Sequence, residues 1–216
     1  MFYPKLCFIL TILVSPIFSN EPLPHPYNQV SLLPELQHGW FCNQPQLEKL
    51  FSEYHITNVI ELGSWLGLST IYLAEKLPED GTLYAVDHWE GSIEHKNDPE
   101  WKKFLPTLYD QFLSNVIHRQ LTHKIVPIRM NTKLAASKLD THADLIYVDA
   151  SHEQADVYCD LNLYYPKLSD KGILCGDDWS WESVRKAVLR FAKEKNLTVT
   201  AEGNFWFFKP RDPDPG

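Results

Sequence analysis

The sequence predicts an α/β protein whose core is a doubly wound, mostly parallel sheet of about seven strands with an antiparallel hairpin at its C-terminal end. Apolar, strand-like runs alternate with helical segments through residues 37–210, which favours strands joined by crossover helices. The final two strand-like runs are separated only by Glu202, Gly203 and Asn204, too few residues for a crossover. These last strands are therefore expected to pair antiparallel to each other.

Each element follows from its local pattern of apolar and turn residues. In chain order, we expect helices over residues 46–55, 67–77, 99–118, 132–138, 153–165 and 181–195. The expected strands cover residues 58–62, 82–87, 124–128, 144–149, 172–177, 197–201 and 204–209. Strands separated by a crossover helix pair in parallel, so the first five strands form the body of the sheet.

The composition indicates a single domain that does not bind nucleic acid. A chain of 216 residues with 44% hydrophobic residues can bury one sizeable core but falls short of two typical domains. Its 28 acidic residues outnumber 20 Lys and Arg, which gives a formal charge of −8. Nucleic-acid binding depends on clustered basic side chains, and the sequence has no such run. We therefore expect a small-molecule partner, and the oligomeric state is left open.

The N-terminal residues differ in kind from the rest of the chain. Residues 6–18 are almost entirely apolar and follow Lys5, which is typical of a secretory signal covering residues 1–19. This run of 13 residues is too short to cross a bilayer comfortably, so an exported protein with a cleaved signal is preferred to a membrane anchor. A cytoplasmic protein is the alternative. Four prolines then predict an extended linker over residues 20–36, and residues 211–216 are expected to form a disordered tail.

The turn after the first expected strand has the features of a cofactor site. Glu61 precedes Gly63 and Gly67, and glycine can adopt positive φ or let a ligand approach the backbone closely. The second strand ends at Asp87, 24 positions after Gly63, close to where a nucleotide-binding β-α-β unit places its ribose-binding carboxylate. The spacing G-x-x-x-G lacks the dinucleotide pattern, and Glu61 would repel a pyrophosphate but attract an ammonium or sulfonium group. S-adenosylmethionine (SAM) is therefore favoured over NAD, and an ordinary strand-turn-helix is the alternative for this turn alone.

Three further acids stand at the ends of later strands: Asp149, Asp177 and Asp178. The carboxyl ends of parallel strands line the ligand site, and hard oxygen ligands suit Mg²⁺ or a similar divalent cation. His152 follows Asp149 by three residues, and because an imidazole titrates near neutrality we take it as the candidate general base. The alternatives are that these acids cap helices and that the histidine is structural.

Four ordered motifs resemble those of class I SAM-dependent methyltransferases, nearest to the small metal-assisted O-methyltransferases grouped as methyltransferase family 24. They are Glu61-x-Gly63-x-x-x-Gly67-x-Ser69, Asp87, residues 147–152 and residues 172–179, and the similarity extends over about residues 38–209. The family usually has glycine where this chain has Ala150. The resemblance implies a Rossmann-like fold that ends in the antiparallel hairpin.

The resemblance and the strand-end positions together define the expected site. We expect SAM to contact Glu61, Gly63, Ser64, Trp65, Gly67, Ser69, Asp87, His88, Met130, Asn131 and Asp149. The resemblance also implies that Asp149, Asp177 and Asp178 bind a divalent cation, for which we expect Mg²⁺. The implied reaction is O-methylation of a hydroxyl on a small molecule, and we favour a sugar or polyol over a catechol. The alternative is an exported protein that keeps the fold and binds its ligand without turnover.

Overall fold

The computed structural model describes residues 22–210. The expected secretory signal over residues 1–19, with its apolar stretch 6–18, and the expected tail over residues 211–216 lie outside the described residues. None of the helices within residues 22–210 is long and apolar enough to span a membrane.

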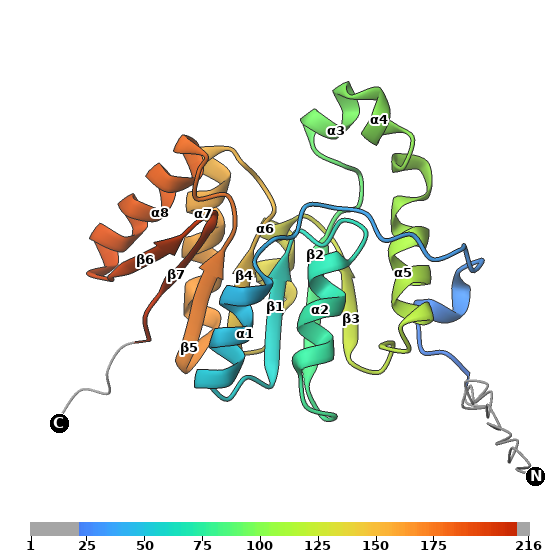
Figure 1. Cartoon of the computed structure of the whole chain (residues 1–216), viewed down its shortest axis with the longest axis horizontal. Helices are drawn as coiled ribbons and strands as arrows, with labels where there is room; N and C mark the ends of the chain where they lie inside the picture. Colours follow the sequence, from blue (N-terminus) through green and yellow to red (C-terminus); the bar gives the residue numbers. More distant parts are fainter. Residues whose placement is uncertain (1–21, 211–216) are drawn as a thin grey trace, which may run out of the picture.

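A single seven-stranded sheet forms the centre of the domain, as the sequence predicts (Figure 1). Its strands are β1 (Asn58–Leu62), β2 (Thr82–Asp87), β3 (Ile125–Arg129), β4 (Ala143–Val148), β5 (Leu168–Gly176), β6 (Val199–Glu202) and β7 (Phe205–Phe208). The strand order is β3-β2-β1-β4-β5-β7-β6. Strands β1 to β5 pair in parallel, whereas β7 pairs antiparallel with both β5 and β6.

The chain changes direction between β1 and β4, and this switch creates the place for a ligand. From β1 the chain moves outward through β2 to β3 and then returns to place β4 on the other side of β1. Ligands of open α/β sheets bind where neighbouring strands lead in opposite directions, beyond their carboxyl ends. Leu62 pairs with Val148 in register, so the residues after β1 and after β4 lie side by side at this edge.

Helices cover both faces of the sheet (Figure 1). One face packs against α1 (Gln44–Glu53), α2 (Leu68–Lys76) and α5 (Leu108–His118), and the other against α6 (Thr132–Lys138), α7 (Gln154–Tyr164) and α8 (Glu182–Lys195). Alternate residues of one strand point to opposite faces, so Val59 belongs to the first layer and Ile60 to the second. Both residues are fully buried, which explains why the strands read as nearly continuous apolar runs.

The helix expected over residues 99–118 is wrong as a single element. The structure has α3 (Ile93–Asn97), α4 (Pro99–Lys102), the 3-10 turn η2 (Leu105–Thr107) and only then α5. Pro106 explains the break, because proline has no N–H for the helical ladder and disfavours helical geometry in the residue before it. We call residues 88–107 the cap. Its helices α3 and α4 stand beyond the carboxyl edge of the sheet (Figure 1).

The proline-rich stretch, expected as an extended linker over residues 20–36, is packed against the domain from Tyr27 onward. Tyr27 lies in the 3-10 turn η1 (Tyr27–Gln29), is buried, and donates a hydrogen bond from its hydroxyl to Ile125 O at 2.8 Å. The chain then runs along α5 and crosses the carboxyl edge of the sheet to reach α1 (Figure 1). Prolines exclude a long helix here, yet an extended segment can still be held by the side chains of its neighbour. We call residues 22–41 the N-terminal strap.

Candidate active site

The acidic residues expected at the site come together at the carboxyl edge of the sheet. Glu61 lies in β1 and Asp87 ends β2, while Asp149 follows β4 and Asp177 follows β5. Burial raises the pKa of Asp149, and the carboxylates of Asp177, Asp178, Glu61 and Asp87 add to this rise. Acidic side chains are therefore concentrated at this edge, which suits a ligand that carries positive charge.

The turn between β1 and α2, which we call the cofactor turn (residues 63–67), needs its glycines. Gly63 has φ 86° and Gly67 has φ 92°, both in the left-handed region that glycine tolerates best. A Cβ atom on Gly63 would lie 2.0 Å from the backbone oxygen of Asp149. Gly63 therefore permits the close approach between the ends of β1 and β4 that forms the floor of the site.

Glu61 lies beneath this turn and has an unused oxygen. It is fully buried, and its Oε2 accepts hydrogen bonds from Ser64 Oγ at 2.6 Å and from the Thr70 hydroxyl. Its Oε1 is buried and has no hydrogen-bond partner among the described residues. Burial raises the pKa of Glu61 to about 7, against the opposing effect of the hydroxyl donors. A buried oxygen without a donor is costly, so a cationic group with N–H donors is the ligand that fits.

Asp87 organises the same turn from the neighbouring strand. Its Oδ2 accepts the backbone N–H groups of Ser64 and Trp65, each at 3.0 Å, and its Oδ1 accepts that of Trp89 at 2.7 Å. The carboxylate is half-buried and stands where β2 ends. Asp87 thus shapes the turn as well as offering oxygens to a ligand.

The remaining residues expected to contact the cofactor differ in their burial and in their contacts. Ser69 is buried within α2, and the Met130 N–H donates to Asp87 O at 3.0 Å, which holds Met130 beside the site. Asn131 caps α6, because its side chain accepts the N–H of Leu134 at 2.8 Å. His88 is exposed, with Nδ1 3.8 Å from the Asp87 carboxylate. The structural role of Asn131 is therefore that of a helix cap.

Beyond the ends of β4 and β5, the side chain of His152 pairs with that of Asp178. His152 Nε2 lies 3.0 Å from Asp178 Oδ2, and the imidazole stacks on the exposed ring of Trp181 with centroids 4.3 Å apart. The hydrogen bond to Asp178 raises the pKa of His152, against the effect of partial burial. Burial raises the pKa of Asp149 and of Asp177, and neighbouring carboxylates add to both effects. His152 is thereby held in a fixed orientation at the mouth of the site.

The three aspartates expected to bind metal do not form a ready ligand cluster. No group of three His, Cys, Asp or Glu side chains with a geometry suited to a metal ion occurs within residues 22–210. Asp178 is engaged by His152, and Asp177 Oδ1 accepts the backbone N–H of Asp178 at 2.7 Å. The structure therefore brings these acids to one edge of the sheet, and metal binding by them stays a prediction.

Two buried polar residues of the site were missed by the sequence. Thr70 donates the second hydroxyl hydrogen bond that Glu61 accepts. Its position in the first turn of α2 is typical of an ordinary helix residue, so the sequence alone does not reveal this contact. Asn43 is 3% exposed, donates from Nδ2 to the Tyr147 hydroxyl at 3.0 Å, and its hydrogen bond opposes the rise in the pKa of Asp177. Its position before α1 resembles that of a helix cap, yet its side chain makes no cap bond. Only the folded structure, which brings Asn43 to Tyr147 of β4 and to Asp177 after β5, reveals its role.

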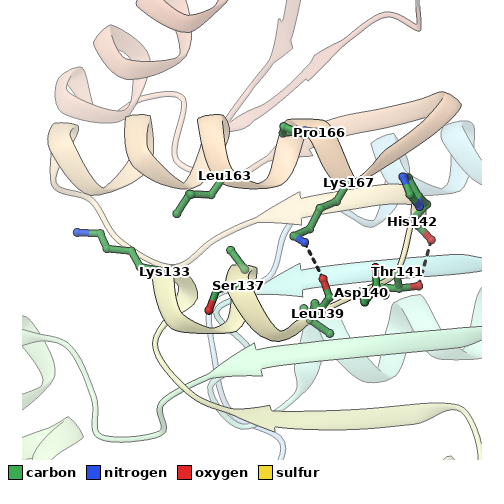
Figure 2. Close-up of a pocket in the computed structure, with 10 residues that line it drawn as sticks. Lys133, Ser137, Leu139, Asp140, Thr141, His142, Leu163, Pro166 and Lys167 are labelled. Atoms are coloured by element: carbon green, nitrogen blue, oxygen red, sulfur yellow. Dashed lines mark hydrogen bonds between the residues drawn. The ribbon is translucent and has the colours of Figure 1, made fainter.

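A cavity of about 300 Å³ lies away from this edge, between α6, the end of α7 and the segment leading into β4 (Figure 2). Its lining includes Lys133, Ser137, His142 and Lys167, and Lys167 Nζ donates to Leu139 O at 2.7 Å. None of the expected site residues lines it. The cavity lies near the amino end of β4, whereas the candidate site lies beyond its carboxyl end.

Gly63→Ala should destabilise the protein more than the backbone strain alone would. An alanine held in the left-handed backbone region lowers the free energy of unfolding by about 1–2 kcal/mol. Here the methyl group would also clash with the Asp149 carbonyl oxygen. Gly203→Ala is a matched control, because Gly203 has φ 62° and an added methyl group there would meet nothing within 4 Å. Urea unfolding should give a clearly larger loss in the free energy of unfolding for Gly63→Ala. Equal losses would contradict the close approach of β1 and β4.

Comparisons with known proteins agree with this architecture. A family model described as a methyltransferase domain, methyltransferase family 24, matches residues 60–179, more than half of the 216-residue chain. A comparison with curated proteins finds no match.

Several solved structures are similar in fold. An O-methyltransferase of tomaymycin synthesis from Streptomyces achromogenes, solved with SAM, has a TM-score of 0.60 at 17% identity, covering 78% of this chain and 80% of that chain. An O-methyltransferase from Bacillus cereus, solved with S-adenosylhomocysteine (SAH), has a TM-score of 0.59 at 16% identity, covering 82% and 84%. A putative rRNA methylase from Clostridium thermocellum has a TM-score of 0.58 at 12% identity, covering 79% and 96%. The names of these proteins differ in substrate class, so the shared fold does not identify the acceptor.

The matched region contains the cofactor turn after β1, Asp87 at the end of β2, and the aspartates after β4 and β5. The unpaired oxygen of Glu61 and the acidic side chains at the strand ends fit a cofactor with an ammonium and a sulfonium group. The chain belongs to methyltransferase family 24 and is a class I SAM-dependent methyltransferase.

Proposed function

We propose that the protein transfers the methyl group of SAM to a hydroxyl of a small molecule, a sugar or polyol in preference to a catechol, with help from a divalent cation. The observation that carries this proposal is the contact of His152 Nε2 with Asp178 Oδ2 at 3.0 Å, beside Asp149 at the end of β4. A histidine at the mouth of a SAM site is suited to accept the proton that a hydroxyl loses during O-methylation.

The donor set at this edge suits a hard cation. Asp149, Asp177 and Asp178 offer carboxylate oxygens, the ligands that Mg²⁺ prefers, and would hold it after small side-chain movements. Their closeness supports the proposal, because the three acids follow the neighbouring strands β4 and β5 at one edge of the sheet. A bound cation would supply Lewis-acid activation of the acceptor hydroxyl.

The residues of the chain have separate tasks in the proposed reaction. Glu61 and Asp87 would bind and orient SAM at the ends of β1 and β2, and the acceptor would lie beyond the ends of β4 and β5. The stacking of His152 on Trp181 limits movement of the imidazole, which receives the hydroxyl proton as the new O–CH₃ bond forms and the S–CH₃ bond breaks. SAH and the methylated acceptor are the products.

The surroundings of the site favour a neutral acceptor that carries several hydroxyl groups. Carboxylates accept hydrogen bonds from hydroxyls, and their negative charge opposes the approach of an anionic acceptor. Trp40 and Trp181 are both exposed beside this edge, and an indole ring offers a flat apolar face with a polar N–H. A sugar or polyol ring presents a matching combination of C–H faces and hydroxyls.

A screen with SAM and Mg²⁺ tests the proposed activity. Panels of sugars, polyols and catechols would be incubated with the protein, and both SAH and the methylated product would be measured by mass spectrometry. We expect an O-methylated sugar or polyol. Methylation of nitrogen or carbon, or turnover with catechols alone, would contradict the proposed acceptor while leaving the methyltransferase assignment intact.

Asp87→Ala should weaken SAM binding by about tenfold to a hundredfold, because a charge-assisted hydrogen bond is worth about 1.5–3 kcal/mol. The loss of its backbone contacts with Ser64 and Trp65 of the turn and with Trp89 adds to the effect. Asp98→Ala is the control, since Asp98 is also a carboxylate that accepts a backbone N–H but caps the exposed helix α4. Calorimetric titration with SAM measures both variants. Unchanged affinity in Asp87→Ala would show that β2 does not contribute to the cofactor site.

A further inference from the structure

Asn115 on α5 is buried and uses its whole amide to join two separate segments. It is 1% exposed, and its Nδ2 donates to Leu36 O and to Leu66 O, each at 2.8 Å. Its Oδ1 accepts the Leu36 N–H at 2.9 Å and Gln111 Nε2 at 3.0 Å. All four hydrogen-bonding positions of the side chain are therefore occupied. Leu36 belongs to the N-terminal strap and Leu66 to the cofactor turn.

The strap and the cofactor turn also touch directly, a few residues farther along. A Cβ atom on Gly39 would lie 3.3 Å from Leu68 and 3.6 Å from Trp65, so the strap passes close to the start of α2. The Trp40 and Trp65 rings have centroids 6.1 Å apart. The next contact is with the cap: His95 stacks on Trp65 at 4.2 Å and on Trp40 at 5.6 Å.

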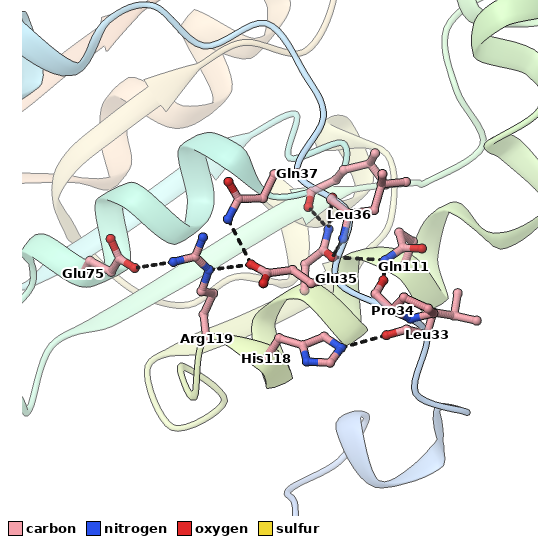
Figure 3. A network of polar contacts seen from close by, with 11 residues as sticks. Leu33, Pro34, Glu35, Leu36, Gln37, Glu75, Gln111, His118 and Arg119 are labelled. Atoms are coloured by element: carbon pink, nitrogen blue, oxygen red, sulfur yellow. Dashed lines mark hydrogen bonds and ion pairs between the residues drawn. The ribbon is translucent and has the colours of Figure 1, made fainter. Parts of the chain in front are cut away.

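The outer part of the strap is held by different side chains of α5 and of the residue that follows it (Figure 3). Gln111 Nε2 donates to Pro34 O at 2.8 Å, and His118 Nε2 contacts Leu33 O at 2.8 Å. Arg119 forms ion pairs with Glu35 at 2.7 Å and with Glu75 at 3.9 Å. These contacts fix the strap to α5 but do not reach the cofactor turn. Asn115 differs from these side chains because it bonds to both segments.

We propose that Asn115 is a positioning residue that couples SAM binding at the cofactor turn to the placement of the N-terminal strap and, through Trp40, of the cap. The proposal rests on the binding of SAM at this turn. A ligand that orders the turn would hold Leu66 O in place, and Asn115 would then hold Leu36 and the aromatic residues that follow it. The strap, the turn and the cap would thereby order together as one wall of the acceptor site.

Hydrogen exchange of the wild-type protein tests the coupling without any substitution. SAH is the probe, and its binding would first be established by calorimetry. We expect SAH to slow exchange of the Leu36 amide and of the backbone amides around Trp40, although these groups lie in the strap. If SAH binds and the strap amides exchange at an unchanged rate, the coupling is refuted. If SAH does not bind, the cofactor assignment fails instead, so the two failures are distinguishable.

Substitutions on α5 separate positioning from general stability. Asn115→Ala should weaken SAH binding at least about fivefold, the lower end of ordinary coupling between sites, and should remove the protection of the strap by SAH. Val116→Ala controls for damage to the helix, because Val116 is fully buried in the core of the same face. Arg119→Ala controls for loosening of the outer strap. Both controls should bind SAH within about twofold of wild type, as expected for sites without a shared partner.

The unfolding free energy of each variant completes the comparison. If Val116→Ala is destabilised as much as Asn115→Ala and loses as much SAH affinity, the role of Asn115 is structural and the proposal is overturned. If Arg119→Ala also removes protection of the strap, the outer contacts transmit the effect and Asn115 is not the coupling residue. If Asn115→Ala does not fold, the exchange result on the wild-type protein decides the question.

Discussion

Removal of divalent cations should abolish methyl transfer and leave SAM binding nearly unchanged. Lewis-acid stabilisation is worth several kcal/mol, which corresponds to a rate loss of about 1,000-fold or more. SAM affinity should persist because Glu61 and Asp87 approach the cofactor from β1 and β2, whereas Asp149, Asp177 and Asp178 follow β4 and β5. Turnover of an identified acceptor would be measured in excess chelator, then after addition of Mg²⁺ or Mn²⁺, alongside calorimetry with SAM.

Asp177→Asn provides the matched substitution for this experiment. It keeps an oxygen that can accept the Asp178 N–H but removes a charge from the proposed ligand set. We expect it to raise the Mg²⁺ concentration needed for half-maximal turnover without changing SAM affinity. Full activity in chelator would refute the proposed role of the cation and leave these aspartates with the structural contacts described above.

His152→Ala should lower kcat by about 100-fold to 10,000-fold, the usual contribution of a positioned acid-base group. SAM affinity and the free energy of unfolding should change little, because His152 lies at the mouth of the site, half-buried against Trp181 and Asp178. Steady-state kinetics with a saturating acceptor separate this loss of rate from a loss of binding.

His123→Ala is the control for the removal of a surface histidine. His123 also faces a carboxylate, with Nε2 3.5 Å from Glu79, but it lies at the other end of the domain, before β3. It should retain wild-type kcat. If His152→Ala retains most of its activity, another group or solvent takes the proton, and the pairing with Asp178 is structural.

The order of elements and the position of the site were predictable from local patterns. The alternation of strands and helices predicted the parallel sheet, and the short connection at Gly203 predicted the antiparallel hairpin. Connectivity of this kind places the carboxyl ends of the strands at one edge. Glu61, Asp87, Asp149 and Asp177 were therefore expected to be neighbours before any distance was known.

The prolines of the chain show where a long helix is excluded, but they do not show what an extended segment contacts. Pro106 interrupts an apolar pattern that otherwise suggests a helix over residues 99–118, and its missing N–H accounts for the separation of α4 from α5. The prolines before residue 36 correctly exclude a long helix but do not reveal whether an extended segment is free or bound. The hydrogen bonds of Leu33 and Leu36 with side chains of α5 show that it is bound.

Local patterns in the chain are enough to predict the fold, the cofactor turn with Gly63 and the acidic strand ends, because these depend on periodicity and on spacings within single β-α units. Which side chains meet across the molecule is visible only in the folded domain. Asn115 bonds to Leu36, 79 positions earlier in the chain, and His152 pairs with Asp178 across the ends of β4 and β5. Such contacts depend on how helices and loops pack onto the finished sheet, and neighbouring residues in the chain carry no local signal of them.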